Sequence, residues 1–184
     1  TRIEQGTVLP EMMRQDTMYN GFTNILGMTG LAGTLVHEFA HLLGSYDLYD
    51  VTGVTMGVGG WSLQGYGGWL GDYGAGAPPG VIPGFCDAFH RVALGFVNPL
   101  VVDQPRDRVL VYAAQMDTGL FASRSDTATP TIVKIPISAD EYYLIENRQV
   151  DVTQPDTIDV DVEDGVVLAI GGNEYDFFQP GSGL

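Results

Sequence analysis

Two histidines and a glutamate within five residues form the part of this chain best suited to chemistry. His37 and His41 are four residues apart, so on a helix they lie on one face, one turn apart. That spacing lets two imidazole nitrogens bind one metal ion. Glu38 follows the first histidine and can face the same ion without binding it. This is the H-E-x-x-H arrangement, in which the glutamate takes a proton from the attacking water.

The residues after the second histidine supply a third candidate ligand. Gly44 can adopt a positive φ at little cost, so it can end the helix and turn the chain back. Asp47 comes six residues after His41 and can return to the metal from another direction. Three protein ligands with an open fourth position are typical of catalytic zinc. The extended motif H-E-x-x-H-x-x-G-x-x-H has histidine where this chain has Asp47, and aspartate is also a zinc ligand.

Other interpretations of these residues stay open. A bare H-E-x-x-H also arises from exposed or capping histidines, although Gly44 and Asp47 at fixed offsets argue against chance. A purely structural zinc would need a fourth protein ligand. The helix is predicted from about Thr29 to Leu43 and is apolar on nearly all sides, which predicts a buried helix. Charged and imidazole groups inside it need a partner, and a metal ion supplies one.

Composition limits the remaining classes of function. A chain of 184 residues can bury one sizeable core, so a single domain is expected. The net charge of -15 argues against nucleic acid or anionic membrane as a partner. No run of eighteen apolar residues is present, so no membrane span is expected. The acidity suits a secreted, soluble protein, with calcium as a second candidate metal. The single cysteine, Cys86, cannot form an internal disulfide.

Along the chain the pattern is α+β. Residues 1–28 indicate a short helix or strand joined by turns, and the glycine-rich region 45–84 is expected to be an ordered wall of an active-site cleft. A second helix is predicted over Pro83–Leu94, with Asp87 in its first turn. His90 in this helix is either an alternative metal ligand or, more simply, a structural or exposed histidine. Strands are predicted at 109–112, 132–137, 142–145, 158–162 and 166–170.

Acidic residues gather near the C-terminal strands. Asp151, Asp156, Asp159, Asp161 and Asp164 could bind calcium, which prefers carboxylate oxygens. No EF-hand spacing is present, so a solvated acidic face is the simpler interpretation.

Five separated segments resemble the immune inhibitor A family of secreted bacterial zinc metallopeptidases, whose architecture is metzincin-like. They follow one another in order from about Gly30 to the C-terminus. The segments are 37–50 (H-E-F-A-H-L-L-G, then D-L-Y-D), 59–63 (G-G-W-S-L), 87–89 with 94–99, 142–149, and 180–184. The resemblance implies that His37, His41 and Asp47 bind zinc. It also implies that Glu38 is the general base, and later the general acid, of peptide hydrolysis.

One position departs from the family's pattern. Metzincin-like enzymes carry a methionine in a turn beneath the zinc, and the aligned residue here is Gln64; Met56 is eight residues too early. Gln64 must either find hydrogen-bond partners or rearrange the floor of the site. Tyr66 matches a tyrosine that assists the oxyanion in some metzincins. Its other interpretation is an aromatic wall residue.

These observations predict a zinc-dependent metalloendopeptidase that cuts protein or peptide substrates outside a bacterial cell. The expected fold is an α+β metzincin-like catalytic domain: an active-site helix, a glycine-rich loop region, a second helix and C-terminal strands. Residues 1–107 would form the zinc-helix and loop part, and residues 108–184 the β-rich part. Only 36 residues precede His37, which predicts a fragment that lacks most of the N-terminal sheet and pairs with other segments of its precursor. The alternative is a catalytically silent surface or binding module that keeps the peptidase fold.

Overall fold

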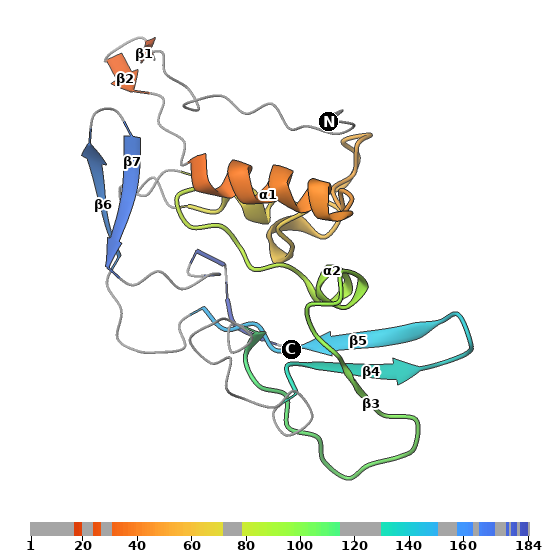
Figure 1. The fold of residues 1–184 in the computed structure, drawn as a ribbon. Helices are drawn as coiled ribbons and strands as arrows, with labels where there is room; N and C mark the ends of the chain where they lie inside the picture. Colours follow the sequence, from red (N-terminus) through yellow and green to blue (C-terminus); the bar gives the residue numbers. More distant parts are fainter. Residues whose placement is uncertain are drawn as a thin grey trace, which may run out of the picture.

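The described residues combine two short α-helices with small β-sheets, as the α+β pattern predicts (Figure 1). The computed structural model describes residues 17–19, 24–26, 31–71, 79–114, 130–150, 158–163, 166–171, 176, 178–179 and 181–183. In this part of the chain no helix is long and apolar enough to cross a membrane.

Helix α1, Leu31–Leu43, is the predicted site helix. Its buried face is made of small or polar residues, among them Gly33, Thr34, His37 and Ala40. This face packs on the irregular chain that follows, because Gly33 leaves room for the backbone at Gly68 to approach closely. The helix therefore presents its histidines to the loop region.

The expectation that α1 is buried on all sides is wrong. Leu35, Phe39, Leu42 and Leu43 are between 41% and 55% exposed, and they lie on the face opposite His37. The helix is apolar all round in sequence, but packing covers only the side that carries the histidines. The sequence pattern predicts which residues are apolar, not which of them find a neighbour.

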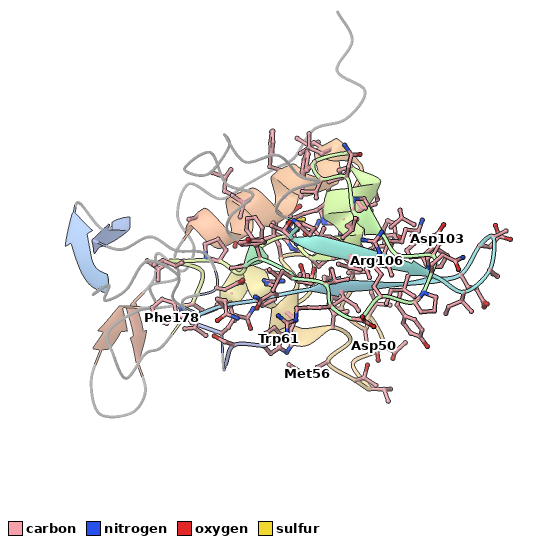
Figure 2. The ribbon with its side chains drawn as sticks, turned by 90° about the horizontal axis from the view of Figure 1, so that it is seen from below. Asp50, Met56, Trp61, Asp103, Arg106 and Phe178 are labelled. Carbon is pink, nitrogen blue, oxygen red and sulfur yellow. The ribbon has the colours of Figure 1, made fainter. Side chains whose placement is uncertain are left out.

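In residues 45–71 and 79–84, the described part of the loop region after α1, the chain is irregular but held by its own hydrogen bonds, as expected of an ordered loop. It contains two short 3-10 helices, η1 (Gly59–Trp61) and η2 (Gly67–Trp69). Main-chain bonds such as Leu48 N–H to Gln64 O at 2.7 Å tie its two halves together. Asp50 closes the turn at residues 50–55, and Met56 is 63% exposed; both lie along one edge of the molecule in Figure 2.

Helix α2, Ala88–Ala93, is shorter than the predicted Pro83–Leu94. Asp87 is its N-cap and accepts a hydrogen bond from the backbone N–H of His90 at 3.0 Å, so the helix begins only after Asp87. Gly95 follows the helix with φ of 75°. In Figure 1, α2 lies between α1 and the sheet β3-β4-β5.

A three-stranded sheet of order β3-β4-β5 includes strands from both sides of residue 107. Strand β3 (Leu100–Val101) pairs parallel with β4 (Ile132–Pro136), which pairs antiparallel with β5 (Tyr142–Glu146). Pro136 needs no donor toward β3, because β3 pairs only with Val133 and Lys134.

Two antiparallel hairpins complete the described strands. Strands β6 (Ile158–Glu163) and β7 (Val166–Gly171) form the expected hairpin. The pair β1 (Thr17–Tyr19) and β2 (Asn24–Leu26) lies in the N-terminal region predicted to be a short helix or strand.

The strand predicted at 109–112 is wrong. That stretch forms no strand, and only the neighbouring Ala113 makes an isolated bridge, to Asn147. Pairing at 109–112 is replaced by separate contacts: the backbone N–H of Tyr112 donates to Pro130 O at 2.9 Å, and Asn147 donates from its side chain to Val111 O at 3.1 Å.

A buried arginine joins the β-rich part to the loop region. Arg148 donates from Nη1 to Trp61 O at 2.7 Å and from Nη2 to Phe85 O at 3.1 Å. It also forms a two-pronged ion pair with Asp176, which is fully buried. Glu146 accepts a further bond at 3.3 Å, so all five N–H groups of the guanidinium are used.

Candidate metal centre

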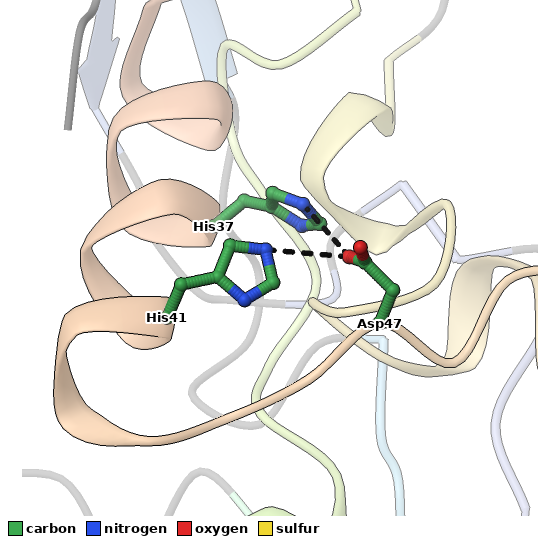
Figure 3. Close-up of side chains that lie close together, drawn as sticks. All are labelled: His37, His41 and Asp47. Atoms are coloured by element: carbon green, nitrogen blue, oxygen red, sulfur yellow. Dashed lines mark ion pairs between the residues drawn. The ribbon is translucent and has the colours of Figure 1, made fainter.

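Three side chains meet at the C-terminal half of α1 (Figure 3). His37 and His41 come from successive turns of the helix, as their spacing predicts. Gly44 has φ of 107°, which turns the chain back after the helix ends. Asp47 then returns to the histidines, and its Oδ1 lies 3.3 Å from Nε2 of each. The structure thus brings together the three residues predicted as ligands.

The two distances between Asp47 Oδ1 and the histidine Nε2 atoms fit a tetrahedral zinc ion. Two ligands bound about 2.0–2.1 Å from zinc in tetrahedral geometry lie about 3.3 Å apart, which matches the two Nε2 to Oδ1 distances of 3.3 Å. Oδ1 of Asp47 is buried and has no hydrogen-bond partner among the described residues. A buried carboxylate oxygen without a donor is costly, and a cation offsets that cost.

The other ring nitrogen of each histidine is held by the main chain. Nδ1 of His37 donates to Leu63 O at 2.8 Å, and Nδ1 of His41 donates to Ser45 O at 3.0 Å. These bonds require a proton on each Nδ1 and turn each Nε2 toward Asp47 Oδ1. Metal-binding histidines commonly donate their second nitrogen in this way, which fixes both tautomer and ring orientation.

Gln64 lies beneath the site and is fully buried. Its amide nitrogen donates to Ser45 Oγ at 2.5 Å and to His37 O at 3.4 Å. The amide nitrogen of Gln64 therefore finds hydrogen-bond partners, which was one of the two outcomes predicted for a glutamine at this position. Its Oε1 has no hydrogen-bond partner among the described residues. Met56, the alternative candidate, is on the exposed loop edge and does not replace it.

Tyr49 is a site residue that the sequence analysis missed. A hydrogen bond to the carboxylate of Asp47 raises the pKa of Tyr49, together with desolvation and the charges of Asp47 and Glu38. Its ring stacks on His37 with centroids 6.4 Å apart. Its position two residues after Asp47 was the only signal in the sequence, and a tyrosine there has no fixed chemical meaning.

The remaining predicted residues are placed around these three ligands. Glu38 is half-buried on α1 and close enough to Tyr49 to influence its pKa. Tyr66 is 37% exposed and packs on Tyr49, with ring centroids 6.3 Å apart. Trp69 packs on His37, with ring centroids 5.2 Å apart.

His90 is not part of the ligand group. It is buried in α2, where Nδ1 donates to Asp87 at 2.8 Å and Nε2 accepts from the backbone N–H of Tyr46 at 3.4 Å. This is the structural interpretation of His90. Burial by itself would raise the pKa of Asp87. Hydrogen bonds from the side chain of His90, from Ser62 and from the backbone of His90 outweigh burial and lower that pKa to about 2.

Comparison with known proteins gives the family. Residues 2–97, just over half of the chain, match the family described as immune inhibitor A peptidase M6, catalytic domain. The chain belongs to the immune inhibitor A peptidase M6 family. This M6 peptidase match contains the three candidate ligands and Glu38, and it ends at Val97. No curated protein and no solved structure matches the chain.

The predicted calcium ligands cannot be placed. Asp151, Asp156 and Asp164 lie outside the described residues, and Asp159 and Asp161 are described only as members of β6. The structure therefore adds no support for a calcium site in this M6 peptidase.

Proposed function

We propose that this M6 peptidase domain is a zinc-dependent metalloendopeptidase that hydrolyses peptide bonds of protein substrates. The observation that carries the proposal is the convergence of His37 Nε2, His41 Nε2 and a buried, otherwise unpartnered Asp47 oxygen at 3.3 Å. Two imidazoles and one carboxylate are a zinc donor set, and three protein ligands leave the fourth position for chemistry. When bound, zinc polarises the scissile carbonyl and lowers the pKa of water.

The chain's own groups supply binding and proton transfer. Nδ1 donation to Leu63 and Ser45 orients both rings and leaves Nε2 of each imidazole facing the position where a metal would bind. Glu38 accepts the proton of the attacking water and gives it to the leaving amine. It is suited to this by its place on α1 between the two histidines, where it is half-buried rather than fully solvated.

The phenols beside the site have different parts in this proposal. Tyr49 donates to Asp47 and so orients the third ligand. Tyr66 is exposed enough to meet a substrate, and its hydroxyl would donate to the developing oxyanion. Its contact with Tyr49 is also compatible with a simple wall residue, and Tyr66→Phe separates the two: the oxyanion role predicts a fall in kcat, the wall role none.

We infer that the enzyme acts outside the cell on proteins or peptides. The motifs shared with secreted members of the family support this, and the charge of -15 suits a soluble exported protein. Other segments of the precursor remain proposed partners.

A catalytically silent module is the second candidate. Gln64 favours it, because an amide with a buried, unpartnered oxygen lies where the family's pattern places a thioether. This alternative predicts a bound metal, or none, without turnover. A structural zinc would need a fourth protein ligand, and the donor group found among the described residues has three members.

The decisive experiment combines metal content with cleavage. Purified protein is assayed for zinc by elemental analysis and for cleavage of casein. Glu38→Gln should keep zinc and lose cleavage, whereas Glu141→Gln, a change of the same kind on an exposed residue of the β-rich part, should keep both. Casein cleavage by Glu38→Gln at the wild-type rate would refute the role of Glu38. Zinc bound with no cleavage by any variant would favour the silent module.

A further inference from the structure

The two main-chain carbonyls that accept from the candidate metal-binding histidines belong to segments that are both connected to one residue, Asp87. Leu63 O accepts from His37, and Ser45 O accepts from His41. These carbonyls lie on different segments, 18 positions apart in the numbering of the chain. Each segment is linked by hydrogen bonds to the carboxylate of Asp87, at the start of α2.

The first link runs through Ser62. Its hydroxyl donates to Asp87 Oδ2 at 2.5 Å and accepts from the backbone N–H of Gln64 at 3.0 Å. The Ser62 hydroxyl therefore links Asp87 to the backbone on the far side of Leu63, the residue whose carbonyl accepts from His37. Ser62 is 1% exposed, so water does not compete for these bonds.

The second link runs through His90. Its Nδ1 donates to the same Asp87 oxygen at 2.8 Å, which leaves Nε2 as an acceptor for the backbone N–H of Tyr46 at 3.4 Å. That N–H and the Ser45 carbonyl belong to one peptide unit. The peptide unit thus donates to His90 on one side and accepts from His41 on the other.

We propose that Asp87 is a positioning residue that sets the orientation of both metal histidines, through Ser62 for His37 and through His90 for His41. The alternative is that Asp87 serves only as the N-cap of α2, where it accepts from the backbone of His90. Capping uses Oδ1, whereas both links use Oδ2, so the two roles are separable by chemistry.

The substitution Asp87→Asn distinguishes the positioning role of Asp87 from its capping role. Asp87→Asn keeps a good N-cap and nearly the same volume. Its amide group can cap with the oxygen, but its nitrogen then faces Nδ1 of His90 as a donor. The imidazole must move its proton to Nε2 to accept that bond. Nε2–H then opposes the N–H of Tyr46, and the peptide unit that receives His41 loses its anchor.

The test measures zinc affinity, not turnover. Zinc dissociation constants are obtained by competition with a coloured chelator, and the absorption spectrum of the cobalt-substituted protein reports ligand geometry. Asp87→Asn should weaken zinc binding about 10–100-fold, the range found when partners of metal ligands are removed, and should change the cobalt spectrum. Ala93→Gly, at an exposed position of the same helix, weakens α2 without touching either link and should leave both measurements unchanged.

Each outcome decides. Wild-type affinity in Asp87→Asn, or an equal loss in Ala93→Gly, overturns the proposal and leaves Asp87 as a cap. If Asp87→Asn does not fold, Ser62→Ala decides instead: it removes one link and should weaken zinc binding several-fold, and unchanged binding would overturn the proposal. The inference rests on the proposed zinc site, but the failures are distinct. A wild-type protein that binds no zinc refutes the proposed function, whereas tight binding by every variant refutes only the role of Asp87.

Discussion

Gly33 and Gly68 touch through their backbones where α1 meets η2. A Cβ placed on Gly33 would lie 1.8 Å from the carbonyl oxygen of Gly68, and the N–H of Gly33 donates to Gly80 O at 2.8 Å. Glycine at position 33 therefore sets how closely the site helix approaches the loop that carries Gln64.

Gly33→Ala tests this contact, because the contact determines whether the substitution raises or lowers the free energy of unfolding. In an exposed helix the change should stabilise by about 1 kcal/mol, but here the clash is with backbone and should destabilise by about 1–3 kcal/mol or more. Chemical denaturation measures the difference. Gly181→Ala, where an added Cβ meets nothing within 4 Å, is the matched control. A Gly33→Ala protein as stable as the control would show that the helix and loop separate easily.

Asp176→Asn should be strongly destabilising. Asp176 is fully buried, pairs with Arg148 and has φ of 71°, a conformation that asparagine also tolerates. The change therefore removes the charge while keeping the backbone, and breaking a buried ion pair costs about 3–5 kcal/mol. Asp140→Asn, at an exposed turn, should change the free energy of unfolding by less than about 0.5 kcal/mol. Equal effects from both variants would contradict the structural importance of the pair.

Acid should remove a defined part of the stability through Asp87. Its pKa is lowered in the folded state from 3.8 to about 2, so the ionised form is favoured by folding. The contribution is fully present above the unfolded pKa and is lost as pH falls from about 4 to about 2, and it amounts to about 2 kcal/mol. The difference in unfolding free energy between the wild type and Asp87→Asn should shrink over this window. If the difference in unfolding free energy between the two proteins stayed constant from pH 6 to pH 2.5, this prediction would be wrong.

Gln64→Met should be tolerated. The variant loses the hydrogen bond to Ser45, worth about 1 kcal/mol, but it also removes a buried oxygen without a partner. These effects oppose each other, so the free energy of unfolding should change by less than about 1–2 kcal/mol. Zinc binding should persist, as measured by chelator competition. Loss of zinc in this variant, with the fold retained, would show that the amide itself organises the site.

Removing the metal should lower thermal stability. At free zinc about 100-fold above its dissociation constant, binding stabilises the folded state by about 2.7 kcal/mol. A chelator should therefore lower Tm for the wild type but not for His37→Ala, which lacks one ligand. The same Tm shift in both proteins would place the metal elsewhere.

The grouping of the three candidate ligands could be predicted because its information is local. Two histidines four residues apart and a glycine before Asp47 specify a helix face and a return turn. In the structure Asp47 Oδ1 lies 3.3 Å from Nε2 of each histidine. The strands at 132–136 and 142–146 were likewise predictable, because their apolar runs lie between turn residues.

Other features depend on distant residues and escaped prediction. The pair Arg148 and Asp176, and the links from Asp87 to Ser62 and His90, join segments whose sequences carry no mutual pattern. The exposed side of α1 was mispredicted for a related reason. Hydrophobicity in a sequence does not say whether another element covers a helix, and only the small-residue face carrying His37 found a partner.

Arg148 binds residues far from it in the sequence, so its contacts can form only late in translation. Trp61 and Phe85 leave the ribosome well before the arginine that binds their carbonyls, and Asp176, which holds that arginine, is translated later still. Helix α1 is translated before all of these residues, yet the contacts of Arg148 are completed only once residue 176 has emerged. The candidate ligands His37, His41 and Asp47 are therefore translated before the contacts of Arg148 with Trp61, Phe85 and Asp176 can form.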